Sequence, residues 1–189
     1  MFFNFVKQNM TKISNKKLKL WELNRLSEEE FKSQRKNPLI IVLDDIRSLN
    51  NIGAFFRTAD AFNIEKIYLC GITACPPHKD IHKTALGATN TISWEYRENI
   101  EELVSELKEQ RVAICSIEQT ENTILLQAIS ELSESKFALI FGNEVNGVKQ
   151  AVVNASDYVI EIPQFGTKHS LNLSVCAGIV LWEFCKKYL

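Results

Sequence analysis

Apolar segments alternate with helix-like ones along this chain, and this alternation constrains its fold more than any other feature. Residues 39–45 read LIIVLDD, an almost continuous apolar run that is typical of a β-strand buried on both faces. Residues 50–62 then place apolar side chains on one side of a helix. Further strands are predicted at 66–71, 92–96, 111–117, 137–142 and 157–162, and further helices at 81–87, 98–110, 123–130, 147–155 and 171–188. This order predicts an α/β fold, a mainly parallel sheet with helices on both faces.

The composition suits one medium-sized domain with a packed core. Of 189 residues, 46% are hydrophobic and 24% are charged, and the net charge is −1. The five cysteines, at 70, 75, 115, 176 and 185, form no CxxC pair, so we expect reduced thiols in a cytoplasmic protein. The opening MFFNFV is too short for the apolar region of a signal peptide, and no apolar run approaches the ~18 residues of a membrane span. We therefore expect no membrane partner. The net charge of −1 argues against bulk nucleic-acid affinity, and no DNA partner is expected.

The N-terminal segment is more basic than the rest of the chain. Residues 7–36 hold nine Lys and Arg and four Glu, a net charge of 9 − 4 = +5, which leaves −6 for the remainder. Residues 1–17 read as an irregular tail. The segment either contacts phosphates or forms a solvated, lysine-rich helix and tail, and charge alone favours the second interpretation.

A short helix is expected within this basic segment. Ser27 and Glu30 have the spacing of a capping box, which predicts a helix over 28–35. The chain is therefore divided into a basic extension with a short helix, residues 1–36, and a main domain, residues 37–189.

Ligands of parallel sheets bind at the carboxyl ends of the strands, so the loops there hold the candidate site. The first such loop leads into the helix that carries Asn51 and Arg57. An arginine among Phe and Ala is unusual, and Asn51 and Arg57 can both address one side of the start of this helix. The structural alternatives are that Asn51 caps the helix and that Arg57 forms an ion pair with Asp60 or Asp44.

The second candidate loop reads GNEVNG and follows strand 137–142. Gly142 and Gly147 allow close approach of backbone to a ligand, and Glu144 between them can accept hydrogen bonds or orient a neighbour. The alternative is an Asn-Gly turn with a surface glutamate.

The third candidate loop follows the last strand. Pro163 ends that strand, and Gly166 relieves the turn. Ser170 is expected as the N-cap or in the first turn of the C-terminal helix, with Asn172 two positions later. Free N–H groups there could bind a carboxylate, a ring nitrogen or a phosphate, and the alternative is simply a capped helix.

Several classes of site are disfavoured by motifs that the sequence lacks. No GxGxxG follows a strand and no GxxxxGK[ST] occurs, which argues against nicotinamide enzymes and phosphate-loop NTPases. His169 has no second His or Cys at ligand spacing, so no metal site is expected. Lys168 and His169 either contact phosphate or face water.

Taken together and in this order, the three loops resemble a known family. NNIGAFFRTADAF (50–62), FALIFGNEVNGV (137–148) and IEIPQFGTKHSLNLSVCAGIVLWE (160–183) are similar to motifs one, two and three of the SpoU/TrmH-type RNA ribose 2′-O-methyltransferases of the SPOUT class. The resemblance covers residues 39–188. Two departures, Gln164 where motif three often has Met and Val145 after Glu144, leave the matched functional positions intact.

The resemblance implies properties that the pattern alone does not show. Members of this family form a deep trefoil knot at the C-terminus, bind S-adenosylmethionine in it, and act as homodimers whose active site is completed across the interface. The implied substrate is RNA, with tRNA favoured over rRNA. Residues 37–189 are then the SPOUT methyltransferase domain. We expect no counterpart of the family's separate N-terminal RNA-binding domain, and this expectation strengthens the interpretation that residues 7–36 contact RNA.

The resemblance also assigns roles to individual residues. The implied catalytic set is Arg57, Asn51, Glu144, Ser170 and Asn172, and the backbone of Gly142, Ile162 and Leu171 is implied to hold the cofactor, joined by the loop at 117–119. Arg57 would either remove the proton of the ribose 2′-hydroxyl or stabilise the developing alkoxide. Two other functions remain as alternatives, a non-catalytic RNA-binding relative and, less favoured, a nucleotide-binding hydrolase.

Overall fold

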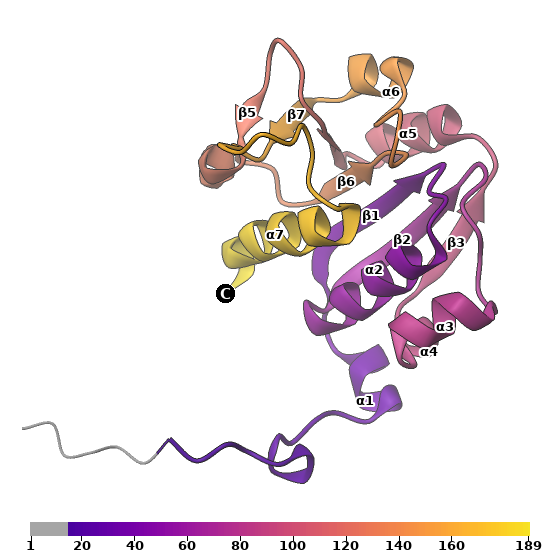
Figure 1. Ribbon diagram of the computed structural model, residues 1–189, viewed down its shortest axis with the longest axis vertical. Helices are drawn as coiled ribbons and strands as arrows, with labels where there is room; N and C mark the ends of the chain where they lie inside the picture. Colours follow the sequence, from indigo (N-terminus) through magenta and orange to yellow (C-terminus); the bar gives the residue numbers. More distant parts are fainter. Residues whose placement is uncertain (1–14) are drawn as a thin grey trace, which may run out of the picture.

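The structure is a computed structural model that describes residues 15–189 (Figure 1). Its strands are β1 (Asn37–Asp44), β2 (Ile64–Cys70), β3 (Trp94–Arg97), β4 (Ala113–Ile117), β5 (Ile124–Leu125), β6 (Phe137–Phe141) and β7 (Tyr158–Glu161). They form one seven-stranded sheet in the order β3-β2-β1-β6-β4-β7-β5, and every neighbouring pair is parallel. The predicted parallel α/β fold is confirmed.

The strand order places late strands between early ones. β6 lies between β1 and β4, and β7 lies between β4 and β5. The loops that follow β1, β6, β4 and β7 therefore leave neighbouring strands at the same edge of the sheet, because all these strands are parallel. This edge brings together all the loops that the sequence marked as candidates. The trefoil knot stays a prediction.

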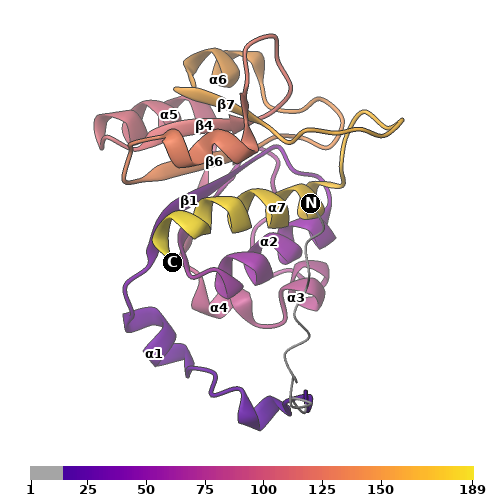
Figure 2. The same cartoon turned by 90° about the vertical axis from the view of Figure 1, so that its left-hand side faces the viewer.

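Helices cover both faces of the sheet (Figures 1 and 2). They are α1 (Glu28–Ser33), α2 (Leu49–Ala61), α3 (Lys79–Ala85), α4 (Ala88–Thr91), α5 (Ile100–Glu109), α6 (Gln150–Ala155) and α7 (Leu173–Cys185), with 3₁₀ helices η1 (Leu20–Glu22), η2 (Leu126–Glu131) and η3 (Lys186–Tyr188). Alternate residues of β1 enter two cores: Leu39 and Ile41 pack with α2 and α7, whereas Ile40 and Val42 pack with α5 and α6. This explains the continuous apolar run in the sequence.

Two aromatic contacts fix the helices next to the candidate loops. Phe55 of α2 meets Phe141 of β6 edge to face at 4.9 Å between ring centroids, and Phe184 of α7 meets Phe137 of β6 in the same way at 5.3 Å. All four rings are fully buried. Burial of each such side chain contributes about 1.5–3 kcal/mol, so α2 and α7 are held firmly against the strand that leads to Glu144.

The helix predicted at 123–130 is wrong. Ile124 and Leu125 instead pair with Ile160 and Glu161 as the edge strand β5, and the 3₁₀ helix η2 follows. The hydroxyl of Thr123, directly before β5, donates to the Glu161 carboxylate of β7 at 2.9 Å and so stabilises the pairing of the two strands. Pairing with β7 outweighs the weak local preference for an α-helix.

Helix α1 of the basic extension lies beside α4, and the described residues before it extend away from the main domain (Figure 2). The predicted capping box is present: the Ser27 amide donates to the Glu30 carboxylate at 2.8 Å, and the Glu30 amide donates to the Ser27 hydroxyl at 3.2 Å. Residues 1–14 of the predicted irregular tail lie outside the described residues. All five cysteines are free thiols. No helix within residues 15–189 is both long and apolar enough to span a membrane.

Candidate active site

The carboxylate of Glu144 joins the second candidate loop to the start of α2. It accepts hydrogen bonds from the backbone amides of Arg47 at 3.1 Å and Ser48 at 3.0 Å, and from the side-chain amide of Asn51 at 3.1 Å. These partners lie 93 to 97 residues away in the sequence. A negative charge at a helix N-terminus is also favoured by the helix dipole. Two of the predicted site residues, Asn51 and Glu144, are therefore in direct contact.

These hydrogen bonds keep Glu144 ionised. Partial burial by itself would raise the pKa of the carboxyl, but the amides of Arg47, Glu144 and Ser48 and the side chain of Asn51 outweigh it and hold the pKa below the ordinary value of 4.5. A carboxylate with a lowered pKa is a weak proton acceptor. The arrangement therefore suits Glu144 to positioning α2 rather than to general-base catalysis.

Replacing Glu144 by glutamine is expected to lower the free energy of unfolding by about 1 kcal/mol or less at pH 7, because the site is partly open to solvent. Since the folded-state pKa is depressed, the contribution of the charge is fully present above pH 4.5 and is lost as pH falls through the folded pKa. Urea unfolding of both proteins at pH 7 and at lower pH measures this. A difference that does not shrink on acidification contradicts the ionic role.

The GNEVNG loop is a closely packed turn. The side chain of Asn143 donates to the Asp45 carbonyl at 2.7 Å and accepts from the amides of Val145 and Asn146 at 2.9 and 3.2 Å. A Cβ on Gly142 would lie 2.1 Å from the carbonyl carbon of Gly147, so no other residue fits there. The predicted Asn-Gly turn exists, but its glutamate is bonded to α2 rather than free at the surface.

Charged side chains from three segments stabilise the same edge of the sheet. Lys149 forms ion pairs with Asp44 at 3.1 Å and Asp45 at 2.7 Å, and so joins the end of β1 to the start of α6. Burial raises the pKa of Asp44 despite the pull of Lys149. Glu118, in the loop after β4, accepts from the amide of Val148 at 3.0 Å. These contacts join segments far apart in the chain, so no local pattern could have indicated them.

The helix caps differ from those expected. Ser48, not Asn51, is the N-cap of α2, with its hydroxyl accepting from the Asn51 amide at 3.3 Å. Asn172, not Ser170, caps α7, and its side-chain oxygen accepts from the amides of Ser174 and Val175 at 3.0 and 3.3 Å. Serine and asparagine are nearly equal as caps, so propensity did not decide between neighbouring positions.

The third candidate loop leaves its backbone open. Within residues 15–189, positions 163–171 make no hydrogen bond to another protein group. Ser170 and Leu171 are exposed, whereas Ile162, at the start of the loop, is half-buried against the core. The loop therefore offers unpaired N–H and C=O groups to a ligand at the carboxyl edge of the sheet.

Arg57 lies apart from the Glu144 cluster. Its side chain is exposed on α2, and no group in the described part of the chain forms an ion pair or hydrogen bond with it. The suggested pairs with Asp44 and Asp60 are absent there, because Asp44 is bound to Lys149 and Asp60 accepts from the Thr91 hydroxyl. The structure thus brings Asn51 and Glu144 together, but shows no contact of Arg57 with Ser170 or Asn172.

Comparison with known proteins shows what this chain is similar to. The model of the "SpoU rRNA Methylase family" matches residues 38–182. The 23S rRNA (guanosine-2'-O-)-methyltransferase RlmB of Neisseria meningitidis serogroup B is 31% identical over 156 residues, which make up 82% of this chain and 61% of that protein. The chain therefore spans about three fifths of the length of this relative.

Solved structures show the same fold. The TrmH/SpoU tRNA modifying enzyme of A. aeolicus aligns with a TM-score of 0.75 at 25% identity, covering 85% of this chain and 80% of that one. The AdoMet-bound rRNA methyltransferase of Sinorhizobium meliloti aligns with a TM-score of 0.73 at 25% identity, covering 82% of this chain and 58% of that one.

Proposed function

Since the chain belongs to the SpoU rRNA Methylase family, we propose that it transfers a methyl group from S-adenosylmethionine to a ribose 2′-hydroxyl of tRNA or rRNA. Relatives are named for both RNA classes, a guanosine of 23S rRNA in N. meningitidis and tRNA in A. aeolicus. One observation in the structure carries the proposal furthest. Glu144 of motif two is bonded to Asn51 of motif one, so two motifs that are distant in the sequence form one site at the carboxyl edge of the sheet.

The open loop 163–171 fits the cofactor. Its unpaired backbone groups can serve an adenine ring or a carboxylate, and Ile162 and Leu171 at its ends add apolar contact. The missing side chain of Gly142 lets the neighbouring turn close, and its backbone is proposed to contact the cofactor. When bound, S-adenosylmethionine supplies an activated methyl group on a sulfonium centre. The protein has mainly to align the ribose with it.

Arg57 is proposed to act electrostatically on the RNA. Arginine keeps its proton in proteins, and only deep burial beside other cations would favour its loss. Its guanidinium is exposed and unpaired within the described residues, the opposite of such an environment. Arg57 therefore suits stabilisation of the developing alkoxide and binding of the adjacent phosphate, with α2 held in place by Glu144.

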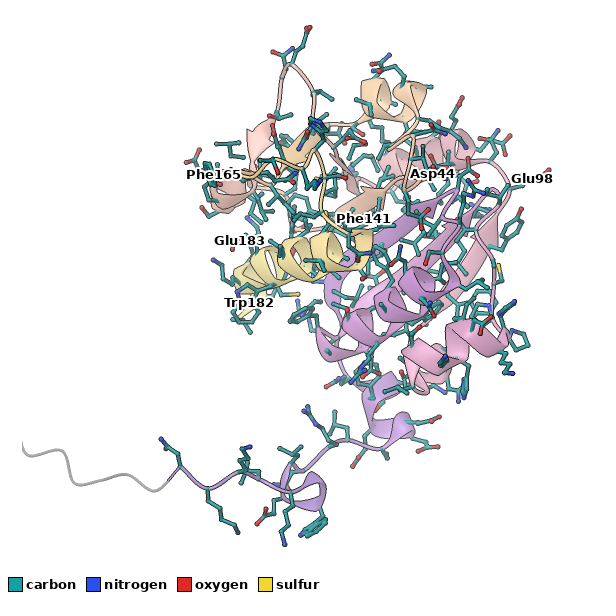
Figure 3. All side chains as sticks on the ribbon, viewed as in Figure 1. Asp44, Glu98, Phe141, Phe165, Trp182 and Glu183 are labelled. Carbon is teal, nitrogen blue, oxygen red and sulfur yellow. The ribbon has the colours of Figure 1, made fainter. Side chains whose placement is uncertain are left out.

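We further propose that two copies of the chain form the active unit. An exposed apolar stripe, at spacings of four, four and three residues, begins just before α7 and continues along it; its members are Leu171, Val175, Ile179 and Trp182. Trp182 points away from the sheet (Figure 3). A stripe of this kind is typical of a protein–protein contact. Across it, a second copy would bring its own residues close to the open loop, where Ser170 and Asn172 can then meet RNA. Free thiols throughout the chain fit action in the cytoplasm.

Methyl transfer tests the proposal directly. The purified chain is incubated with S-adenosylmethionine tritiated on its methyl group and with unfractionated bacterial tRNA or rRNA, and the modified nucleotide is then identified by mass spectrometry. A 2′-O-methylated ribose is the expected product. Absence of transfer to both RNA classes, together with absence of cofactor binding in calorimetry, would overturn the proposal. RNA binding without transfer would support a non-catalytic relative instead.

A further inference from the structure

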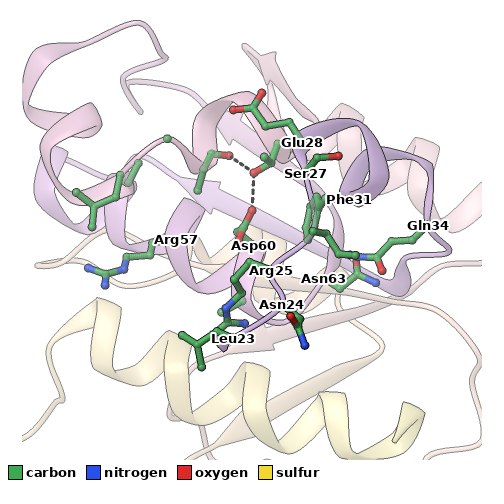
Figure 4. A pocket seen from close by; sticks show the side chains of 17 residues that line it. Leu23, Asn24, Arg25, Ser27, Glu28, Phe31, Gln34, Arg57, Asp60 and Asn63 are labelled. Atoms are coloured by element: carbon green, nitrogen blue, oxygen red, sulfur yellow. Dashed lines mark hydrogen bonds between the residues drawn. The ribbon is translucent and has the colours of Figure 1, made fainter. Parts of the chain in front are cut away.

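A pocket of about 540 Å³ separates the basic extension from the main domain (Figure 4). One wall comes from residues 23–34 of the extension, and the other comes from the second half of α2 and from the turn between α3 and α4. Arg57 lines this pocket. The volume lies within the range of about 300–1,000 Å³ that small-ligand sites occupy, and it is too small for a double helix.

The extension is fastened to the main domain rather than merely lying near it. The side chain of Gln34 donates to Asn63 at 3.1 Å, and Asn63 in turn donates to the carbonyl of Arg35 at 2.9 Å. Phe31 packs against the core that includes α2. The α1 part of the wall that the extension forms is thus held in place by specific contacts.

The lining combines cations with exposed apolar side chains. Arg25 lies on the wall that the extension forms and Arg57 on the wall that α2 forms, and within the described residues neither forms an ion pair. Leu26 and Leu86 are 52% and 66% exposed. Leu86 also has φ +49°, a left-handed conformation that a bulky residue rarely adopts. Leu86 is the C-cap of α3, where helices commonly end in this conformation.

Two carboxylates narrow the choice of ligand. Glu28 and Asp60 also line the pocket, and Asp60 accepts a hydrogen bond from Thr91 at 2.5 Å. A free phosphate would meet these negative charges and is a poor occupant. The amino group of a nucleobase, in contrast, donates well to a carboxylate, while guanidinium groups stack on the base and bind the phosphate beside it.

We propose that this pocket binds one unpaired nucleotide of the RNA, next to the nucleotide whose ribose Arg57 contacts. The base enters between the two walls and packs against Leu26 and Leu86. The phosphates of this nucleotide lie beside Arg25 and Arg57. Residues 15–36 hold seven Lys and Arg and four Glu, a net charge of 7 − 4 = +3, which favours a polyanion such as RNA over a basic or neutral protein segment. The inference rests on the proposed function, because that function brings RNA to Arg57.

Two matched arginine variants test the pocket. Arg25→Ala removes a pocket cation, whereas Arg35→Ala removes an exposed cation of the same extension that does not line the pocket. With unfractionated tRNA and rRNA as probes, Arg25→Ala should raise the Kd about tenfold and Arg35→Ala less than about twofold, and only Arg25→Ala should lower the salt dependence of RNA binding. In methyl transfer, Arg25→Ala should raise KM for RNA and leave kcat unchanged. Equal effects of the two variants on RNA affinity would overturn the pocket and indicate general charge attraction.

A variant that fills the pocket gives an independent measurement. Ala61 is exposed at the end of α2 and lines the pocket, so Ala61→Trp should occupy it without disturbing the core. We expect weaker RNA binding and loss of ultraviolet cross-links between RNA and residues 23–34, at an unchanged melting temperature. Unchanged RNA affinity, or a changed oligomeric mass in place of an RNA effect, contradicts the proposal. If the wild type binds RNA in the pocket but transfers no methyl group, the proposed function fails and the pocket stands.

Discussion

Replacing Arg57 by alanine is expected to lower methyl transfer to RNA by about 100- to 1,000-fold, the loss typical when one group that stabilises a developing negative charge is removed. The ribose oxygen becomes anionic as it attacks, and Arg57 is the exposed cation that α2 presents there. Its side chain makes no ion pair in the described part of the chain, so its loss should change stability by less than about 0.5 kcal/mol. Single-turnover rates at saturating RNA, with calorimetry for S-adenosylmethionine, measure the two effects separately.

The Arg57 experiment has two controls. Arg57→Lys keeps the charge but loses the planar pair of donors, so an intermediate rate is expected if the side chain grips a phosphate or alkoxide in two places. Arg35→Ala, on the extension, controls for the loss of one positive charge from the protein. A fully active Arg57→Ala protein would show that the proposed catalytic role is wrong. A large loss of cofactor binding would instead assign Arg57 to the cofactor site.

The sheet could be predicted because its signal is local. The run at 39–44 becomes β1 in the centre of the sheet, where both faces are covered and every position gains from being apolar. The capping box at Ser27 was likewise predictable, since both partners lie three residues apart. The α-helix prediction for 123–130 was wrong because the start of this segment pairs with the edge of β7. Its partner Ile160 lies 36 residues further along the chain than Ile124.

The structure brings Asn51 and Glu144 into contact, but the sequence did not indicate this contact. Resemblance selected Glu144 and Asn51, but nothing in the sequence showed that they bond to each other across 93 residues. The amides of Arg47 and Ser48 were missed, because a backbone donor leaves no mark on residue type. The Ser48 cap had a signal, since serine directly before an apolar helical pattern is a strong N-cap, but Asn51 was an equally acceptable candidate.

Replacing Ile179 by glutamate is expected to convert the proposed dimer into monomers. Ile179 lies in the middle of the apolar stripe on α7 and is 39% exposed in the single chain. In a dimer its side chain would be buried, and an unpaired carboxylate there would cost several kcal/mol, which weakens association about 100-fold or more. Because its exposed face contributes nothing to the core of one chain, the monomer should remain folded. Light scattering after gel filtration, with circular dichroism, checks both statements.

The matched control is Leu125→Glu on β5, which introduces the same charge at an apolar residue that is 42% exposed outside the stripe. It should leave the mass of the wild-type assembly unchanged. If the active site is completed by the partner, Ile179→Glu should also lose methyl transfer about 100-fold or more in parallel with dissociation, and high protein concentration should restore part of it. A monomeric Ile179→Glu protein with full activity would show that each chain is catalytically complete. A wild type that is itself monomeric at micromolar concentration would leave the stripe on α7 without the second copy proposed to cover it.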